Sequence, residues 1–245
     1  MLKLIACNVF MREACHAVAS SPHVIDVDFT ELGEHSRSDG LRQIIQSRID
    51  ATEASGKKYE AILLLFGLCG NGTVGIEARG TPLVMPRAHD CCTILLGSRA
   101  KFVEHFGTNP STPFSSCGYL ERGEYFLRTA EDGTSSVETG DALQAYIKQY
   151  GEEDGRYIWE EMHPQHAGNQ NAVFIELPET SALGHADKFM EKAQASGKNV
   201  RKLVGDIRLI KNLIHGTWNE DEFLIVPPSK KIQGVYDHDK IVRVG

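Results

Sequence analysis

The densest group of reactive side chains lies between residues 69 and 92. It contains Cys69, His89 and the adjacent pair Cys91 and Cys92, and a further thiol, Cys7, lies near the start of the chain. Thiolates and imidazoles are the usual ligands of zinc in proteins, and a catalytic zinc ion keeps one coordination position open. The residue types therefore predict a zinc site made of Cys7, Cys69, His89 and Cys91.

Four neighbours of these residues add chemistry to the predicted site. Asp90 is placed to orient a ligand or to act as a general base, and Arg87 is placed to hold an anionic group in a bidentate contact. Gly70 and Gly72 favour a tight turn in which the backbone approaches a ligand or cradles an anion. A dinucleotide site is disfavoured, because the helix after these glycines would be too short for a Rossmann crossover.

The spacing leaves a second interpretation open. Cys69 and His89 are not at a zinc-finger spacing, and the chain contains no CxxC pair. Free cysteine is among the most buried residue types, so several of these thiols are equally explained as core residues. His163 and His166 form another pair, but Pro164 favours a solvated loop there. Signatures of serine hydrolases, zincins and P-loop proteins are absent from the sequence.

Composition and charge disfavour several classes of protein, namely nucleic-acid-binding, membrane-spanning and secreted proteins. The 245 residues include 26 Lys and Arg against 33 Asp and Glu, a net charge of -7 that disfavours nucleic-acid binding. The longest apolar run, residues 61–66, is too short to span a membrane. The N-terminal residues lack the pattern of a signal peptide. We therefore expect a cytoplasmic protein whose six cysteines are thiols or metal ligands and not disulfides.

Hydrophobic patterning predicts an α/β fold, a mostly parallel sheet flanked by helices. The layering is Rossmann-like but lacks a standard dinucleotide site. Strands are expected at 2–10, 24–29, 59–66, 82–86, 172–177, 200–204 and 222–226. Helices are expected at 12–19, 41–53, 90–106, 141–150, 185–196 and 206–214. We expect a single domain over residues 1–245, with a loop-rich excursion at about 109–140.

These elements would bring the reactive residues together. Cys7, Cys69 and His89 each fall near the carboxyl end of a predicted strand. Neighbouring parallel strands lie about 5 Å apart, and ligands of open α/β sheets bind beyond the carboxyl ends of the strands.

Several motifs resemble those of an uncharacterised family, domain of unknown function 1638. They lie at residues 1–7 (MLKLIAC), 65–72 (LFGLCGNG), 86–91 (PRAHDC), 95–98 (LLGS), 116–121 (SCGYLE) and 225–228 (IVPP). Such proteins often have a proline at the position of Cys117, which places Cys117 outside the family's pattern of ligands. They commonly have an apolar residue at Cys92, which favours Cys91 as the ligand.

The resemblance implies one-carbon or methyl-group metabolism, because genes of such proteins often lie beside corrinoid methyltransferase genes. The leading expectation is a zinc-dependent transferase that acts on a methyl or thiol group of a small molecule. A metal-dependent hydrolase, a metal- or corrinoid-binding accessory protein and an iron–sulfur protein are the alternatives. A corrinoid protein and a second copy of the chain are the expected partners.

Overall fold

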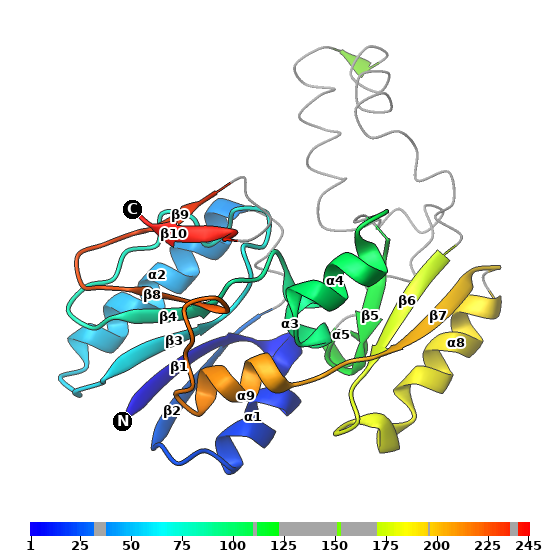
Figure 1. Ribbon diagram of the computed structural model, residues 1–245, viewed down its shortest axis with the longest axis horizontal. Coiled ribbons are helices and arrows are strands. Elements are labelled where there is room, and N and C mark those ends of the chain that lie inside the picture. Colours follow the sequence, from blue (N-terminus) through cyan, green and yellow to red (C-terminus); the bar gives the residue numbers. More distant parts are fainter. Residues whose placement is uncertain (32–37, 110–111, 123–150, 153–170, 196, 236–239) are drawn as a thin grey trace.

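The protein is built from two mostly parallel β-sheets with helices packed against them (Figure 1). The computed structural model describes residues 1–31, 38–109, 112–122, 151–152, 171–195, 197–235 and 240–245. This architecture confirms the predicted α/β class.

The larger sheet has five strands in the order β2-β1-β3-β4-β8. The first four are parallel, and β8 pairs with β4 in the antiparallel direction. The bounds are β1 Leu2–Cys7, β2 Ile25–Thr30, β3 Ala61–Leu65, β4 Leu83–Pro86 and β8 Phe223–Val226. All five residues of β3 are buried, as expected for a parallel strand that is covered on both faces.

Helices cover this sheet from two sides. The chain moves from β1 to β2 in one direction and from β2 to β3 in the other, so right-handed crossovers place α1 (Met11–Ala19) and α2 (Ser38–Ala54) on opposite faces. Helix α9 (Arg208–Ile214) packs beside α1. In α2, the buried Leu41, Ile45 and Ile49 recur every four residues and form an apolar stripe.

The smaller sheet consists of three parallel strands, in the order β5-β6-β7. The strands are β5 (Phe114–Ser116), β6 (Asn171–Glu176) and β7 (Asn199–Val204). Helix α5 (Cys117–Arg122) begins directly after β5. A 3-10 turn, η4 (Ser181–Leu183), and helix α8 (His185–Ala195) follow β6. Both α5 and α8 therefore begin near the carboxyl edge of this sheet.

Two sequence predictions need correction. The single helix expected at 90–106 is two helices, α3 (Cys91–Leu96) and α4 (Arg99–Phe106), because Gly97 takes a left-handed conformation with φ of 77° and ends α3. The side chain of Ser98 then caps α4 by accepting a hydrogen bond from the Lys101 amide. Within the excursion expected at about 109–140, β5 and α5 are regular elements where we predicted loops.

Some sequence predictions lie outside the described residues. These are the helix at 141–150, the pair His163 and His166, and most of the excursion. Among the helices that the structure describes, none is long and apolar enough to cross a membrane.

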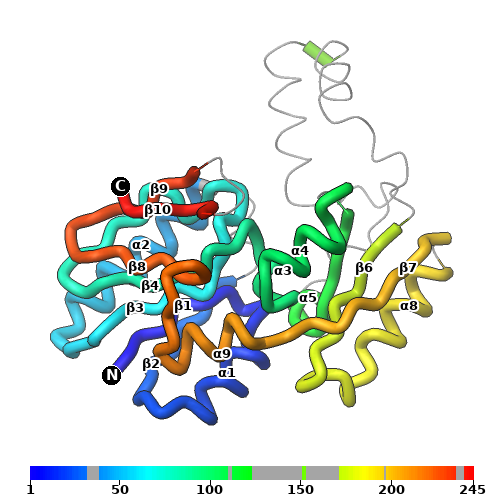
Figure 2. Tube along the Cα trace, in the orientation of Figure 1, coloured from blue at the N-terminus to red at the C-terminus, as the bar shows by residue number. Residues whose placement is uncertain are grey.

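The chain enters the smaller sheet from the larger one and later returns (Figure 2). The blue and cyan N-terminal strands share the larger sheet with the orange β8, whereas the green and yellow middle of the chain builds the smaller sheet. Strands β9 (Ile232–Gly234) and β10 (Val242–Val244) then form a separate hairpin-like pair. Buried side chains of both sheets, such as Leu4 and Ile175, belong to one hydrophobic cluster. A single domain stays a prediction.

The two sheets meet closely where α5 packs on the 3-10 turn η1 (Asn8–Phe10), which follows β1. A Cβ atom added at Gly118 would lie 1.7 Å from the carbonyl oxygen of Val9. No side chain fits in that space, so glycine at position 118 sets how closely α5 approaches the larger sheet.

We expect Gly118→Ala to destabilise the protein by about 3 kcal/mol or more, because the methyl group must push α5 away from η1. Urea unfolding measures this free energy. Gly184→Ala is the control: Gly184 directly precedes α8 and has nothing within 4 Å of an added Cβ. Its left-handed φ of 68° costs only about 1 kcal/mol. Equal losses in the two variants would contradict the packing argument.

Candidate metal site

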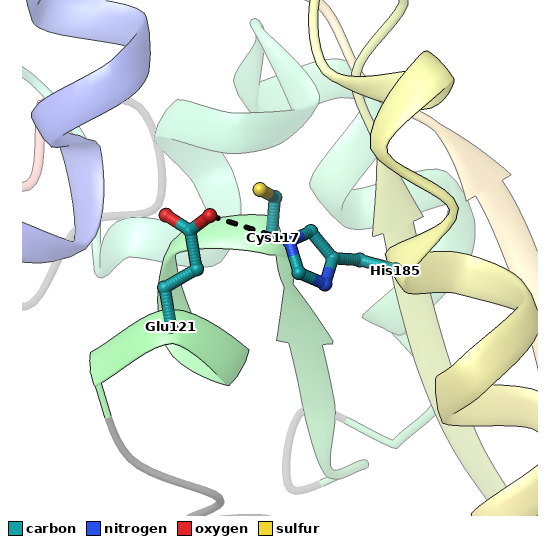
Figure 3. Close-up of side chains that lie close together, drawn as sticks. All are labelled: Cys117, Glu121 and His185. Carbon is teal, nitrogen blue, oxygen red and sulfur yellow. Dashed lines mark hydrogen bonds and ion pairs between the residues drawn. The ribbon is translucent and has the colours of Figure 1, made fainter.

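Cys117, Glu121 and His185 form a compact group of metal-ligand side chains (Figure 3). One ligand atom from each lies within 4.8 Å of the others. Cys117 and Glu121 are four residues apart on α5, so helical geometry places them on one face. His185 is the first residue of α8, and its Nε2 lies 3.2 Å from Glu121 Oε1. In the part of the chain that the structure describes, no other such group occurs.

The electrostatic surroundings distinguish the thiol from the carboxylate. Cys117 is 4% exposed, and burial raises the pKa of its thiol to about 11, with the charges of Glu121 and Glu13 adding to the effect. Hydrogen bonds from Arg12 instead hold the pKa of Glu121 below its ordinary value. Arg12 Nε lies 2.8 Å from both carboxylate oxygens. Glu121 is thus held ionised and oriented by a residue of α1.

A cavity of about 530 Å³ opens beside this group. Its walls come from α1, from the end of α5 and from residues 179–183, and they include Glu13, Glu121 and Thr180. The Thr180 side chain is hydrogen-bonded to the Cys117 thiol. Of the three candidate ligands, Glu121 lines the cavity and Cys117 and His185 do not, and the volume is that of a small-molecule site.

Glu13 is the unusual residue of the cavity wall. It is only 1% exposed, and neither of its carboxylate oxygens has a hydrogen-bond partner among the described residues. Burial raises its pKa to about 7, because the charged form loses its hydration, and the nearby Glu121 adds to this effect. A buried carboxylate without a partner costs free energy in the folded protein, so it requires an explanation.

The thiols predicted from the sequence lie together elsewhere, at the carboxyl edge of the larger sheet. Cys7 ends β1, Cys69 follows β3, and Cys91 begins α3. Burial raises the pKa of Cys69 to about 12, and the charges of Asp90 and Cys7 add to this effect. Burial also raises the pKa of Cys91, with a further contribution from Cys69. Cys91 Sγ lies 2.5 Å from the hydroxyl oxygen of Tyr119 on α5. The three thiols thus lie within electrostatic range of one another, and Cys69 and Cys91 are half-buried.

The fourth predicted ligand, His89, has a different neighbour. Its ring packs against Phe102, with centroids 6.1 Å apart. The group of ligand atoms found within 4.8 Å of one another includes neither His89 nor any of the three thiols. Zinc at Cys7, Cys69, His89 and Cys91 stays a prediction.

Asp90 and Arg87, the two charged residues expected beside that site, form hydrogen bonds with backbone groups. The Asp90 carboxylate accepts a hydrogen bond from the Thr93 amide at 3.0 Å and so caps α3. Arg87 donates to the backbone carbonyl oxygens of Glu220 at 2.8 Å, Lys240 at 3.0 Å and Val242. These bonds give both residues structural roles, and their proposed roles in chemistry are untested.

The glycines of the turn after Cys69 also have a structural explanation. Cys69, Gly70 and Asn71 have φ angles of 46°, 60° and 69°, three consecutive left-handed residues. A Cβ on Gly72 would lie 2.7 Å from a Leu41 side-chain carbon. Gly70 and Gly72 therefore allow the tight turn that the sequence predicted, and a role in cofactor binding stays a prediction.

Glu121 and His185 were not among the residues predicted as ligands, and Cys117 was placed outside the family's pattern of ligands. Glu121 and His185 are 64 residues apart and come from two elements, so no local motif joins them. The i, i+4 spacing of Cys117 and Glu121 is a usable signal on a helix, but we expected loops in this segment.

Thiol labelling of the native, metal-free protein is expected to show one fast cysteine, the exposed Cys15. Cys69 should react slowly near neutral pH, because its pKa of about 12 leaves little thiolate. A chromogenic disulfide reagent followed by peptide mass spectrometry measures both rates. Cys15→Ser should remove the fast phase. Fast labelling of Cys69 would contradict the buried environment.

Glu13→Gln is expected to change how the stability of the metal-free protein depends on pH. A folded-state pKa raised to about 7 from 4.5 stabilises the protein fully below pH 4.5, and this contribution is lost as the pH rises through 7. Between pH 5 and pH 8 the free energy of unfolding of the variant should therefore gain roughly 2–3 kcal/mol relative to the original protein. Urea unfolding at both pH values measures it.

The control is Glu104→Gln, which changes an exposed carboxylate on α4 in the same way. A pH-independent difference between Glu13→Gln and the original protein would show that Glu13 ionises normally.

Comparison with known proteins gives one positive result. No curated protein sequence and no solved structure matches the chain. A family model described as "Protein of unknown function (DUF1638)" matches residues 29–214 and so spans α5, α8 and all three candidate metal ligands. The match covers well over half of the chain, and the protein belongs to the DUF1638 family.

Proposed function

We propose that the protein is a metal-dependent enzyme that acts on a small molecule, with one zinc ion held by Cys117, Glu121 and His185. The observation that supports this proposal is the convergence of a thiol, a carboxylate and an imidazole within 4.8 Å. Sulfur, nitrogen and oxygen donors of these types are the ligands of zinc, and three protein ligands leave the fourth position for water or substrate.

The surroundings favour a metal at this position. Zinc binding would replace the thiol proton of the buried Cys117 and would join a carboxylate that Arg12 already holds ionised. Arg12 would be the outer residue that orients this ligand. A reducing compartment such as the cytoplasm would keep the thiol available.

The leading reaction class is hydrolysis. Zinc lowers the pKa of bound water, and the buried carboxylate of Glu13 on the cavity wall would take the proton released. The hydroxide oxygen would then bond to the carbonyl carbon of the substrate. The bond to the leaving group would break, and the leaving group would receive the proton from Glu13.

Methyl or thiol group transfer in one-carbon metabolism is the second candidate. The specific observation in its favour is the charge of the ligand set: one thiolate and one carboxylate would cancel the two positive charges of zinc. A substrate thiolate bound to such a neutral centre would stay nucleophilic toward a methyl group. A corrinoid protein would be the methyl donor. An accessory protein that only carries the metal or corrinoid would show no turnover.

Zinc analysis of protein purified without oxygen tests the site. We expect about one equivalent of zinc in the original protein and a loss of most of it in Cys117→Ser and His185→Ala, because each removes one of three ligands. Cys69→Ser and His89→Ala are matched controls at the edge of the larger sheet, and they should keep the metal.

The opposite result, zinc lost only in Cys69→Ser and His89→Ala, would move the metal to the site predicted from the sequence. Absence of zinc from the original protein after reconstitution would overturn the proposal. Visible absorbance with bound iron would replace zinc by an iron–sulfur centre.

A further inference from the structure

The cavity beside the candidate metal site has two charged side chains in its wall that lack a charged partner. Arg122 comes from the end of α5 and Glu179 from the turn that follows β6, and both residues are exposed. Neither of them forms an ion pair with any residue that the structure describes. One cavity thus presents a guanidinium group and a carboxylate whose charges the described part of the chain does not compensate.

The other carboxylates and the other arginine of this wall are committed or covered. Arg12 and Glu121 neutralise each other, with Arg12 Nη2 2.7 Å from Glu121 Oε1. The carboxylate oxygens of Glu13 are buried, so they do not face the open space of the cavity. Arg122 and Glu179 are therefore the groups that an ionic ligand would contact.

The surroundings of Arg122 leave it able to bind an anion. Its Nη2 atom lies 2.7 Å from the sulfur of Met11 on α1. A thioether sulfur is uncharged and a weak acceptor, so this contact positions the guanidinium group without neutralising it. The other nitrogen atoms of Arg122 donate to no described residue. A planar guanidinium group with free N–H donors matches the two oxygens of a carboxylate.

Glu179 lies in a turn whose backbone is held on its C-terminal side. The Thr180 amide donates to the Leu177 carbonyl oxygen at 3.0 Å, and the Leu183 amide donates to the Thr180 carbonyl oxygen at 3.1 Å. These bonds hold the backbone that carries Glu179 at the edge of the cavity. An ionised carboxylate only accepts hydrogen bonds, so its partner must be a donor such as an ammonium group.

The same wall also has an apolar part, made of Met11, Ala182 and Leu183. Leu183 is 41% exposed, and an apolar group of a ligand that covered it would gain from the removal of both surfaces from water. The cavity volume of about 530 Å³ is that of a small-molecule site.

We propose that this cavity binds a free amino acid with an apolar side chain, whose carboxylate is held by Arg122 and whose ammonium group is held by Glu179. One such molecule supplies both missing charges. A simple anion would leave Glu179 unpaired, and a simple amine would leave Arg122 unpaired. The inference goes beyond the proposed function and does not depend on a metal ion, because neither residue is a candidate metal ligand.

Leucine is the probe, and two analogues each lack one of its charges: 4-methylpentanoate has no amino group, and 3-methylbutylamine has no carboxylate. Isothermal titration calorimetry on the metal-free protein gives a dissociation constant for each ligand. The variants are Arg122→Gln and Glu179→Gln. The matched controls are Arg243→Gln and Glu104→Gln, which change exposed residues that do not line the cavity.

We expect the original protein to bind leucine at least about fivefold more tightly than either analogue, because each analogue loses hydrogen bonds to a charged group. Arg122→Gln should weaken the binding of leucine and 4-methylpentanoate by at least about fivefold and leave 3-methylbutylamine unchanged. Glu179→Gln should weaken leucine and 3-methylbutylamine and leave 4-methylpentanoate unchanged. Both controls should match the original protein, and circular dichroism checks that all four variants are folded.

Three results would overturn the inference. The first is an original protein that does not bind leucine within the solubility of this ligand. The second is equal affinity for leucine and either analogue, since one of the two charged contacts would then be absent. The third is unchanged leucine affinity in Arg122→Gln or Glu179→Gln, as expected of a merely solvated side chain. Zinc analysis tests the proposed function separately, so a protein that binds leucine but no zinc would keep this inference and overturn only the metal site.

Discussion

The contact between Gly118 and the Val9 carbonyl group determines where α5 lies, and most of the chemistry described above depends on α5. This short helix supplies Cys117 and Glu121, and its approach to η1 brings Glu121 within reach of Arg12 on α1. The three-residue strand β5 could not hold it there alone. The candidate metal site thus combines ligands from the smaller sheet with an orienting residue from the larger one.

The same helix touches both groups of reactive side chains. Tyr119 points its hydroxyl group at Cys91, in the thiol group of the larger sheet, while Cys117 and Glu121 face His185. The two faces of α5 therefore meet surroundings of different polarity. The thiols of the larger sheet sit in an apolar core that opposes charge, whereas Glu121 is held ionised by Arg12. Burial raises the pKa values of Cys69 and Cys91, and this favours their thiol forms over the thiolates.

Sequence periodicity predicted most strands of the larger sheet, but it did not predict the residues of the candidate metal site. The apolar run of β3 and the four-residue repeat of Leu41, Ile45 and Ile49 carry their structure locally, so their type and approximate bounds were predictable. The helix breaks between α3 and α4 because Gly97 has a left-handed φ angle, and the apolar pattern of the sequence does not reveal this angle. The triad depends on tertiary packing that joins α5 to α8, and no single-sequence pattern encodes a contact across 64 residues.

The antiparallel strand β8 completes the larger sheet beside β4, although the whole smaller sheet lies between them in the chain. During synthesis on the ribosome, the edge of β4 that pairs with β8 therefore stays unpaired until more than a hundred further residues have emerged. Arg87 follows β4, and its hydrogen bonds to the Lys240 and Val242 carbonyl groups can form only after these later residues are synthesised. Such long-range closure slows folding and leaves an exposed strand edge in the nascent chain, where chaperone binding would protect it.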